Sequence, residues 1–537
     1  MKKRIFAAVL SSALLLTACS TSGGSSSSGQ REGTQTPILA DYDITLSDSE
    51  ITLDGQMLAQ DGGKTVTLSH DIVYYHDNTG EDYGAGTQAD MHTREEADAH
   101  TVVTIREPGT YRVSGALSAG QLAVDLGEEA KRDRSAVVTL VLDGVDITCT
   151  VAPAVIFYNV YECDEAWVAY DEGETEDYNL LPADVDTSAA GANVVLADGS
   201  VNRVNGSYVA RIYKEGTTKK LHKYDGAFYS KMSLNISGET EGTGSLSITA
   251  ENEGLDTELH LTINGGQIRI QAQNDGINTN EDGVSVTTVN GGGLQINAGL
   301  GEEGDGIDSN GHIVINGGTV YSMASDHSPG GGLDADGEIL IKGGQVTALG
   351  VRNDTVSPDS EQLYMELSFA SALSAGAKVE LEGTSLSFTL EKGAQSILYS
   401  APELERDVSY TLKVDGVVQQ YTGHTGGSFF GRPGEGLQPP EGQGFPEDGF
   451  QPPERQGPPQ RPEEGGEPPQ MPDGQQSPEP PRGKDRPRPS QGGFGQFTVG
   501  EEGEPSADFT LTDSVHSFSG IREQNKYALA GTAKGFG

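Results

Sequence analysis

The chain has 537 residues, of which 80 are acidic and 35 basic, and its formal net charge is −45. An acidic excess of this size argues against nucleic acid and an anionic membrane surface as partners. It is compatible with divalent-cation binding and with an exported protein. Only three cysteines are present, so no disulfide framework is expected. Whether Cys149 and Cys163 pair is left open.

A secretory signal opens the chain. Lys2-Lys3-Arg4 precedes a largely apolar run from Ile5 to Leu16, and Thr17-Ala18 then stand before Cys19. Small residues in front of a cysteine make residues 1–19 similar to a bacterial lipoprotein signal peptide. We therefore expect a protein that is exported and held on the extracellular face of the cell membrane by lipid on Cys19. The Ser/Gly-rich residues 20–36 are the expected tether.

Residues 37–100 combine leading strands with an acidic insertion. Alternating apolar and polar residues predict strands from Tyr42 to Tyr75, whereas His76 to His100 is less apolar and predicts loop plus one short helix near Met91–Ala99. From Thr101 the pattern becomes strand-like again and continues to Gly350. We interpret residues 101–350 as one body of nine or ten coils.

A short phrase recurs five times within this body. Its copies place a glycine before an apolar residue: Asp225-Gly226-Ala227, Glu253-Gly254-Leu255, Asp275-Gly276-Ile277, Asp305-Gly306-Ile307 and Gly331-Gly332-Leu333. Each of the last four copies is followed by a short apolar segment that ends in a glycine. These glycines, 26 residues apart, are Gly266, Gly292, Gly318 and Gly344. A fixed period of about 20 to 50 residues predicts a solenoid.

Apolar residues keep the same phase around these glycines. One row lies three residues before them and another two residues after them: Ile263, Val289, Ile315, Ile341 and Ile268, Leu294, Val320, Val346. Spacing of two on both sides of a turn indicates strand, turn, strand. A lone coil cannot bury its inward row, whereas coils stacked about 4.8 Å apart share a continuous core. The prediction is an all-β fold, a parallel β-helix.

Three segments follow the coils. Residues 360–424 contain several strand-like stretches and predict a small appended β-module. Residues 425–496 are rich in proline, glycine and glutamine, cannot bury a core, and predict a disordered spacer. Residues 497–537 regain some alternation around Phe509–Thr512, which is compatible with one more strand added to another part of the molecule.

Oxygen-bearing side chains fall into three columns when the coils are aligned on the glycine of the recurring phrase. Just before that glycine come Asp225, Glu253, Asp275, Asp305 and Gly331; two residues after it come Phe228, Asp256, Asn278, Asp308 and Asp334; two further on come Ser230, Glu258, Asn280, Asn310 and Asp336. Two unit charges ~5 Å apart repel by roughly 3 kcal/mol at an effective dielectric near 20. Such a stack needs counter-ions.

Calcium is the predicted cofactor, because it accepts about 6 to 8 hard oxygen ligands. The predicted ligands are Asp225, Glu253, Asp256, Asn274, Asp275, Asn278, Asn280, Asp305, Asp308, Asn310, Asp334 and Asp336. Zinc would require cysteine or histidine, and His260, His312 and His327 are assigned to no shared column. One alternative stays open, in which the aspartates only cap turns by accepting backbone N–H groups.

The order of several segments resembles one bacterial family. The segments are Pro108–Gly115, Leu140–Gly144, Tyr224–Lys231, the Asp-Gly-Ile coils and Ser400–Leu404. Together, from Ile44 to Val418, they are similar to secreted, calcium-binding β-helix carbohydrate-binding proteins known for binding cellulose and pectin-like acidic polysaccharides. The resemblance implies a right-handed helix with bound calcium and a relationship in coil geometry to polysaccharide lyases. The family's paired-acid pattern is matched at Asn274–Asn278, is partial at Gly304–Asp308, and is broken at Glu253 and Gly331.

These features favour a cell-surface lipoprotein that binds an acidic, uronate-containing or plant cell-wall polysaccharide without cleaving it. A calcium-dependent lyase needs a lysine or arginine base, and from Met232 to Ile341 there is no lysine and only Arg269. No catalytic residue is therefore assigned, and the residues that contact carbohydrate stay unassigned. The alternatives are a calcium-dependent polysaccharide lyase and a structural envelope protein. We expect a monomer that meets the membrane only through its lipid.

Overall fold

The computed structural model describes residues 38–59, 63–76, 84–175, 185–214, 220–425, 505–512 and 515–524. The predicted signal, Cys19, the tether and nearly all of the proline-rich segment lie outside these residues. The chain separates into two compact units, Met1–Pro37 and Ile38–Gly537, and every described residue belongs to the second. Among the described helices, none has the length and apolar character to cross a membrane.

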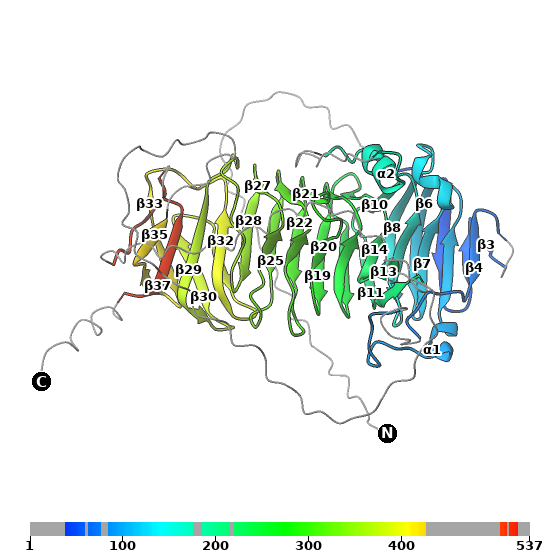
Figure 1. Ribbon diagram of the computed structural model, residues 1–537, viewed down its shortest axis with the longest axis horizontal. Coiled ribbons are helices and arrows are strands. Elements are labelled where there is room, and N and C mark those ends of the chain that lie inside the picture. Colours follow the sequence, from blue (N-terminus) through cyan, green and yellow to red (C-terminus); the bar gives the residue numbers. More distant parts are fainter. Residues whose placement is uncertain are drawn as a thin grey trace, which may run out of the picture. The chain divides into compact units, whose positions relative to one another are not determined.

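Strands dominate the described residues, which confirms the all-β class (Figure 1). A first ladder of parallel strands contains β1 (Tyr42–Leu46), β6 (Gly109–Leu117), β8 (Val138–Thr148), β10 (Ala192–Leu196), β15 (Leu234–Gly238), β18 (Leu261–Ile263), β21 (Val286–Val289), β24 (His312–Ile315) and β27 (Ile339–Ile341). A second parallel ladder starts at the paired ends of β6 and β8. It continues through β11 (Val201–Gly206), β16 (Ser245–Ala250), β19 (Gln267–Ala272), β22 (Gly293–Asn297), β25 (Thr319–Met323) and β28 (Gln345–Gly350).

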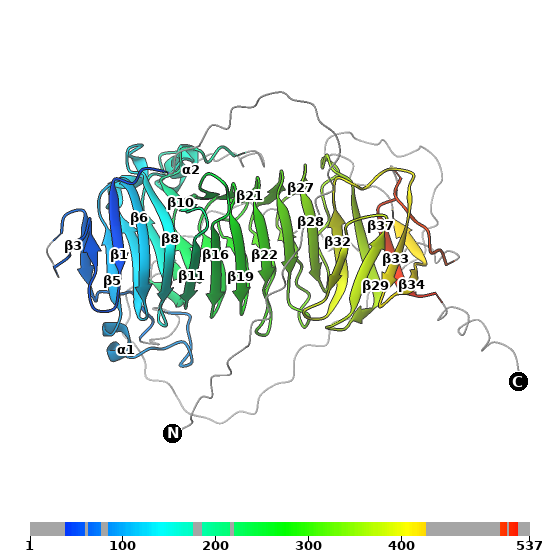
Figure 2. The same cartoon turned by 180° about the vertical axis from the view of Figure 1, so that it is seen from behind.

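A separate nine-stranded sheet forms the third ladder. It contains β4 (Val66–Ser69), β5 (Thr101–Ile105), β7 (Gly120–Asp125), β9 (Val155–Asn159), β14 (Gly226–Ser230), β17 (Glu253–Thr257), β20 (Ile277–Thr279), β23 (Ile307–Ser309) and β26 (Leu333–Ala335). All its pairings are parallel except that of β4 with β5. From β17 onward, each successive coil of the chain therefore gives one strand to each ladder. Figure 2 shows β16, β19, β22 and β28 of the second ladder following one another along the molecule.

The 26-residue period sets the register between coils. Ile263 pairs with Val289, which pairs with Ile315, and Ile315 pairs with Ile341; all four are buried. The turn glycines of these coils have positive φ values, 87° at Gly266, 82° at Gly292, 80° at Gly318 and 85° at Gly344. At Gly292 a Cβ would come within 2.4 Å of the carbonyl oxygen of Gly266. The glycines therefore allow both the turn and the close stacking of coils.

The coils are fewer than the sequence predicted. Between Thr101 and Gly350 the third ladder has eight strands, β5 to β26, instead of nine or ten. The difference lies between β9 and β14, where one coil is lengthened by two insertions. They are helix α2 (Glu165–Asp171) and the antiparallel hairpin of β12 (Val209–Tyr213) and β13 (Lys220–Tyr224).

Smaller elements surround the ladders. They are β2 (Thr52–Leu53), β3 (Gln56–Met57), the 3-10 helix η1 (Glu128–Arg132) and helix α1 (Arg94–Asp98). Helix α1 confirms the short helix predicted near Met91–Ala99, and it begins with a capping box between Thr93 and Glu96. Cys149 and Cys163 are both free, so they form no disulfide here.

The last strands pair antiparallel, except that β29 (Tyr364–Leu373) and β37 (Ser517–Glu523) are parallel. The others are β30 (Lys378–Glu382), β31 (Ser387–Thr389), β32 (Ala394–Ser400), β33 (Ser409–Val414), β34 (Val417–Gln420), β35 (Gly423–Thr425) and β36 (Phe509–Thr510). Strand β32 pairs antiparallel with β28 and so ends the second ladder. Strands β36 and β37 come from the C-terminal segment, pair with β29, β33, β34 and β35, and place Phe509 and Phe518 in the core of this module.

Candidate metal centre

Four of the predicted ligands stack directly along the third ladder. Asp256 of β17 pairs with Asn278 of β20, which pairs with Asp308 of β23, and Asp308 pairs with Asp334 of β26. These side chains occupy alternate positions to the buried residues Leu255, Ile277, Ile307 and Leu333. The predicted second column is therefore present from Asp256 to Asp334.

The first coil departs from the predicted alignment by one residue. Tyr229, not Phe228, pairs with Asp256, and Ser230 pairs with Thr257. The reason is that Phe228 takes an inward place, fully buried and stacked on Phe157 with ring centroids 6.5 Å apart. Burial of a large aromatic side chain thus decides the register of this coil.

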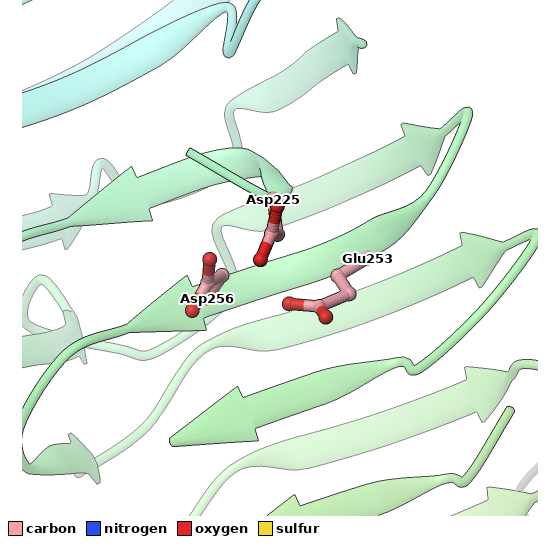
Figure 3. Close-up of side chains that lie close together, drawn as sticks. All are labelled: Asp225, Glu253 and Asp256. Carbon is pink, nitrogen blue, oxygen red and sulfur yellow. The ribbon is translucent and has the colours of Figure 1, made fainter. Parts of the chain in front are cut away.

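The tightest group of carboxylates lies at this irregular coil (Figure 3). Asp225, Glu253 and Asp256 each offer one oxygen, and the three oxygens lie within 4.8 Å of one another. Asp225 immediately precedes β14, and the other two residues belong to β17. The three residues are 7%, 5% and 0% exposed. The sequence pattern matched the resembled family best at Asp275, whereas the structure brings the acids closest around Glu253.

Several oxygens of this cluster lack a hydrogen-bond donor. Asn278 donates from Nδ2 to Glu253 Oε1 at 3.1 Å, and Asn280 donates from Nδ2 to Asp256 Oδ1. Three atoms of this cluster are buried without a hydrogen-bond partner among the described residues: Glu253 Oε2, Asp256 Oδ2 and Asn278 Oδ1. A buried oxygen without a donor is costly, and a hard cation satisfies several such oxygens at once. The residues present therefore fit a calcium ion.

Burial and mutual repulsion disfavour the charged forms of these acids. The pKa of Glu253 is raised well above its usual value by burial and by the charges of Asp256, Asp225 and Asp275. Burial likewise raises the pKa of Asp256 well above its usual value, together with Asp225. The charged forms of these acids are therefore costly without a cation, and a bound cation would relieve that cost.

The acids of the next coils are partly used as turn caps. Asp275 accepts the backbone N–H of Asp305 through Oδ1 at 2.6 Å, and Asp305 accepts that of Gly331 in the same way at 2.6 Å. The turn-cap alternative is thus realised at these two residues. Their other carboxylate oxygens are not used in these bonds.

Ionisation is disfavoured in these coils too. Burial, with the charge of Asp308 next, raises the pKa of Asp275 to about 8. Burial and Asp305 raise the pKa of Asp308 to about 7. Burial and a hydrogen bond with Asp354 raise the pKa of Asp334 to about 8. The carboxylates therefore form a continuous strip in which the charged forms are disfavoured.

The remaining predicted ligands lie at the margins of this strip. Asn310 donates from Nδ2 to the carbonyl of Asn280 and to Asp282 Oδ1, both at 2.9 Å. Asp336 is exposed, and Asn274 is half-buried. These three side chains are therefore less suited to hold an ion than the buried cluster.

Lys223 enters the acidic strip, and the sequence analysis missed it. It lies on β13 of the hairpin insertion, and its Nζ donates to Asn280 Oδ1. Its charge lowers the pKa of Asp225 and Asp256, against the larger effect of burial. The only sequence signal was its place two residues before Asp225, outside the lysine-free range from Met232 to Ile341. The hairpin gives the strip a cation that the coils do not supply.

Two of the three histidines, His260 and His312, accept hydrogen bonds from backbone N–H groups. The prediction that the histidines share no column was wrong for these two. His260 and His312 both align with Val286, and His312 pairs with it directly. Each accepts through Nδ1 a backbone N–H from the next coil, that of Val286 at 3.2 Å and that of Glu338 at 2.9 Å. They act as turn acceptors, so this column does not indicate a zinc site.

A family model and a curated relative that match this chain carry the same description. A family model described as "Carbohydrate-binding domain-containing protein" matches residues 99–397, more than half of the chain. A relative of that description from Acetivibrio thermocellus is 29% identical over 171 residues, which is 32% of this chain and 45% of the relative. The chain thus spans less than half of that relative's length. A solved structure, a gadolinium derivative of the polysaccharide lyase-like protein from C. thermocellum, is similar at 21% identity and a TM-score of 0.31, covering 56% of this chain and 92% of that one.

Proposed function

Because the chain belongs to the family of carbohydrate-binding domain-containing proteins, we propose that it binds a polysaccharide without cleaving it, through a right-handed parallel β-helix that holds calcium. The three parallel ladders supply the stacked coils of this helix. Calcium occupies the strip of carboxylates along β17, β20, β23 and β26. The lipid on Cys19 holds the protein on the extracellular face of the cell membrane.

One observation supports calcium above all others. Three buried oxygens of the candidate metal cluster have no hydrogen-bond partner among the described residues: Glu253 Oε2, Asp256 Oδ2 and Asn278 Oδ1. Asn278 bonds Glu253, and Glu253 lies close to Asp256. Asp225 completes the set of oxygens. Bound calcium neutralises charge there, and where the strip reaches the surface it bridges to carboxylates of a uronate polymer.

Two measurements test this proposal on the full chain. The first is the calcium content of purified protein after dialysis against micromolar calcium, for the wild type and for Asp256→Asn. The second is binding of polygalacturonate by isothermal titration calorimetry in calcium and in EDTA. Calcium content that falls in the variant, with polygalacturonate binding that disappears in EDTA, supports the proposal. Equal binding in calcium and in EDTA contradicts the bridge, and binding to no glycan in either buffer leaves the structural envelope protein as the better hypothesis.

Lys223 gives the lyase alternative a specific basis. A lyase removes the proton beside a uronate carboxylate, and the base must lie next to the cation that acidifies this proton. The Nζ of Lys223 is bonded to Asn280, whose amide bonds Asp256 of the candidate metal cluster. The check is formation of unsaturated uronate from polygalacturonate, followed by ultraviolet absorbance, for the wild type and Lys223→Met. Product that forms in the wild type and not in the variant would establish the lyase.

A further inference from the structure

A groove lies on the outer face of the first ladder, on a different sheet from the carboxylate strip. Its volume is about 310 Å³, at the lower end of ligand sites. The floor is made by one outward residue from each of four successive strands: Asn235 of β15, Thr262 of β18, Thr288 of β21 and Val314 of β24. Asn264, Asn290 and Asn316 line one side, and residues 185–188 line the other.

The wall formed by residues 185–188 is fixed to the floor at two points. The Thr187 hydroxyl bonds Asn235 Oδ1 at 2.8 Å and the Thr262 hydroxyl at 2.7 Å. Val185 packs against an outward apolar cluster that includes Val314. Because the wall is held by both polar and apolar contacts, the groove is formed before a ligand arrives, which lowers the entropic cost of binding.

The asparagines form a ladder with unused hydrogen-bonding capacity. Asn290 donates from Nδ2 to Asn264 Oδ1, and Asn316 donates in the same way to Asn290 Oδ1, both at 2.8 Å. An asparagine amide has two N–H donors and two acceptor lone pairs. The ladder uses one of each at Asn290, so one donor and one acceptor stay available. The rungs repeat every coil, about 4.8 Å apart.

Thr288 provides a second, independent sign of a ligand. It lies on the floor, is only 8% exposed, and its hydroxyl has no hydrogen-bond partner among the described residues. The equivalent hydroxyl one coil earlier, that of Thr262, bonds Thr187. The floor of the groove therefore offers one hydroxyl that can bond a partner from outside.

The chemistry of the groove selects the ligand. Nine of the eleven residues that line it are polar, and none of the eleven is basic or aromatic. Asp186 is the one charged residue there, and hydrogen bonds from Ser188 lower its pKa, which keeps it negative. Amides and hydroxyls both donate and accept, as glycan hydroxyls do, whereas a uronate carboxylate needs cationic partners. A neutral glycan fits this groove, and an acidic one does not.

We infer that this groove is a binding site for a neutral glycan segment, separate from the calcium strip and independent of calcium. The inference rests on the proposed polysaccharide binding and adds a second class of ligand to it. The asparagine ladder and Thr288 contact the hydroxyls of the glycan, and the half-buried Val185 contacts an apolar ring face.

Calorimetry on the full chain tests the inference with cellohexaose, xylohexaose and mannohexaose as neutral probes and hexagalacturonate as the acidic probe. At least one neutral probe binds, with the same affinity in calcium and in EDTA. Ser188→Trp, an exposed wall position, lowers that affinity at least tenfold, and Thr288→Val lowers it about fivefold, the loss expected for one hydrogen bond. Ser387→Trp on β31 and Thr249→Val on β16, both exposed and outside the groove, leave it unchanged.

The inference is overturned by failure of all three neutral probes to bind at millimolar concentration, by wild-type affinity in Ser188→Trp, or by loss of neutral-probe binding in EDTA. The hexagalacturonate arm keeps the two proposals apart. Hexagalacturonate binding that is lost in EDTA and retained in Ser188→Trp supports the calcium strip whatever the neutral probes do. Hexagalacturonate binding that is lost in Ser188→Trp and retained in EDTA places the acidic glycan in the groove and contradicts both proposals.

Discussion

The carboxylate strip and the asparagine ladder arise from the same coils but differ in one chemical property. An asparagine both donates and accepts, so Asn264, Asn290 and Asn316 satisfy one another from coil to coil. An ionised carboxylate only accepts, so stacked acids cannot satisfy one another, and atoms such as Glu253 Oε2 stay without a donor. A repeated column of side chains therefore satisfies its own hydrogen bonds only when its residue both donates and accepts. The strip needs protons or cations, whereas the ladder needs neither.

Removal of calcium tests this difference with the largest expected effect. A ligand that binds only the native state stabilises it by about 2.7 kcal/mol per site at a hundredfold excess over Kd, and the strip extends over several coils. Thermal melts in millimolar calcium are therefore expected to have a clearly higher midpoint than melts in EDTA. An unchanged midpoint would show that the acids bind no calcium.

The pH dependence in EDTA should follow from the raised pKa values. In the unfolded chain these aspartates titrate near pH 4, whereas in the native state Asp308 titrates at about 7 and Asp275 and Asp334 at about 8. Between these limits the native state binds more protons, so the free energy of unfolding falls as pH rises from about 5 to about 8. Calcium binds the deprotonated acids and should flatten this fall. Urea denaturation at several pH values, with and without calcium, measures both slopes.

Asp256→Asn separates charge from hydrogen bonding at the tightest cluster. Asparagine resembles the protonated acid, so we expect little loss of stability in EDTA. In calcium the variant loses an ion ligand, and a loss of up to about 2.7 kcal/mol is expected. Chemical denaturation in both buffers gives the two values. Equal losses of stability in calcium and in EDTA would mean that Asp256 holds no ion and only accepts its hydrogen bond from Asn280.

Asp305→Ala tests a residue that has a structural role as well. Its Oδ1 caps the N–H of Gly331, so a loss of about 1 kcal/mol is expected in EDTA, by analogy with helix caps. If Asp305 also holds an ion, the calcium-dependent part of the melting shift shrinks and the measured ion content falls. A loss that is the same in both buffers, with unchanged ion content, would leave Asp305 as a turn cap alone.

Asn290→Ala tests the ladder and has the smallest expected effect. The substitution removes two solvent-exposed amide bonds, which predicts a loss of about 0.5 kcal/mol. The loss should be the same in calcium and in EDTA, because the ladder is complete without ions. Denaturation curves in the two buffers provide the check, and a difference between them would contradict the separation of strip and ladder.

Much of the fold could be predicted because the repeat is local. The strands, the turns at Gly266 and its equivalents, and the buried rows at Ile263 and Ile268 all follow from spacing within one coil. The column from Asp256 to Asp334 follows in the same way. Calcium, the right-handed winding and the lipid anchor stay predictions.

Insertions and irregular coils could not be predicted in this way. The first acidic coil is offset by one residue from the recurring phrase, because Phe228 is buried opposite Leu255. The hairpin that brings Lys223 to Asn280 has no period of its own. Its position depends on contacts with residues far away in the sequence.

The sequence by itself determined the repeated coil, its inward apolar rows and the order in which acids and asparagines recur, because a period repeats the same local chemistry. Only the tertiary structure decided which of these side chains meet. It joined Asp225 to Glu253 and Asp256, laid residues 185–188 along the asparagine ladder, and added β36 and β37 to the strands before the proline-rich segment. The physical reason is that these contacts join segments with no common period, so packing of particular side chains, and not spacing, fixes them.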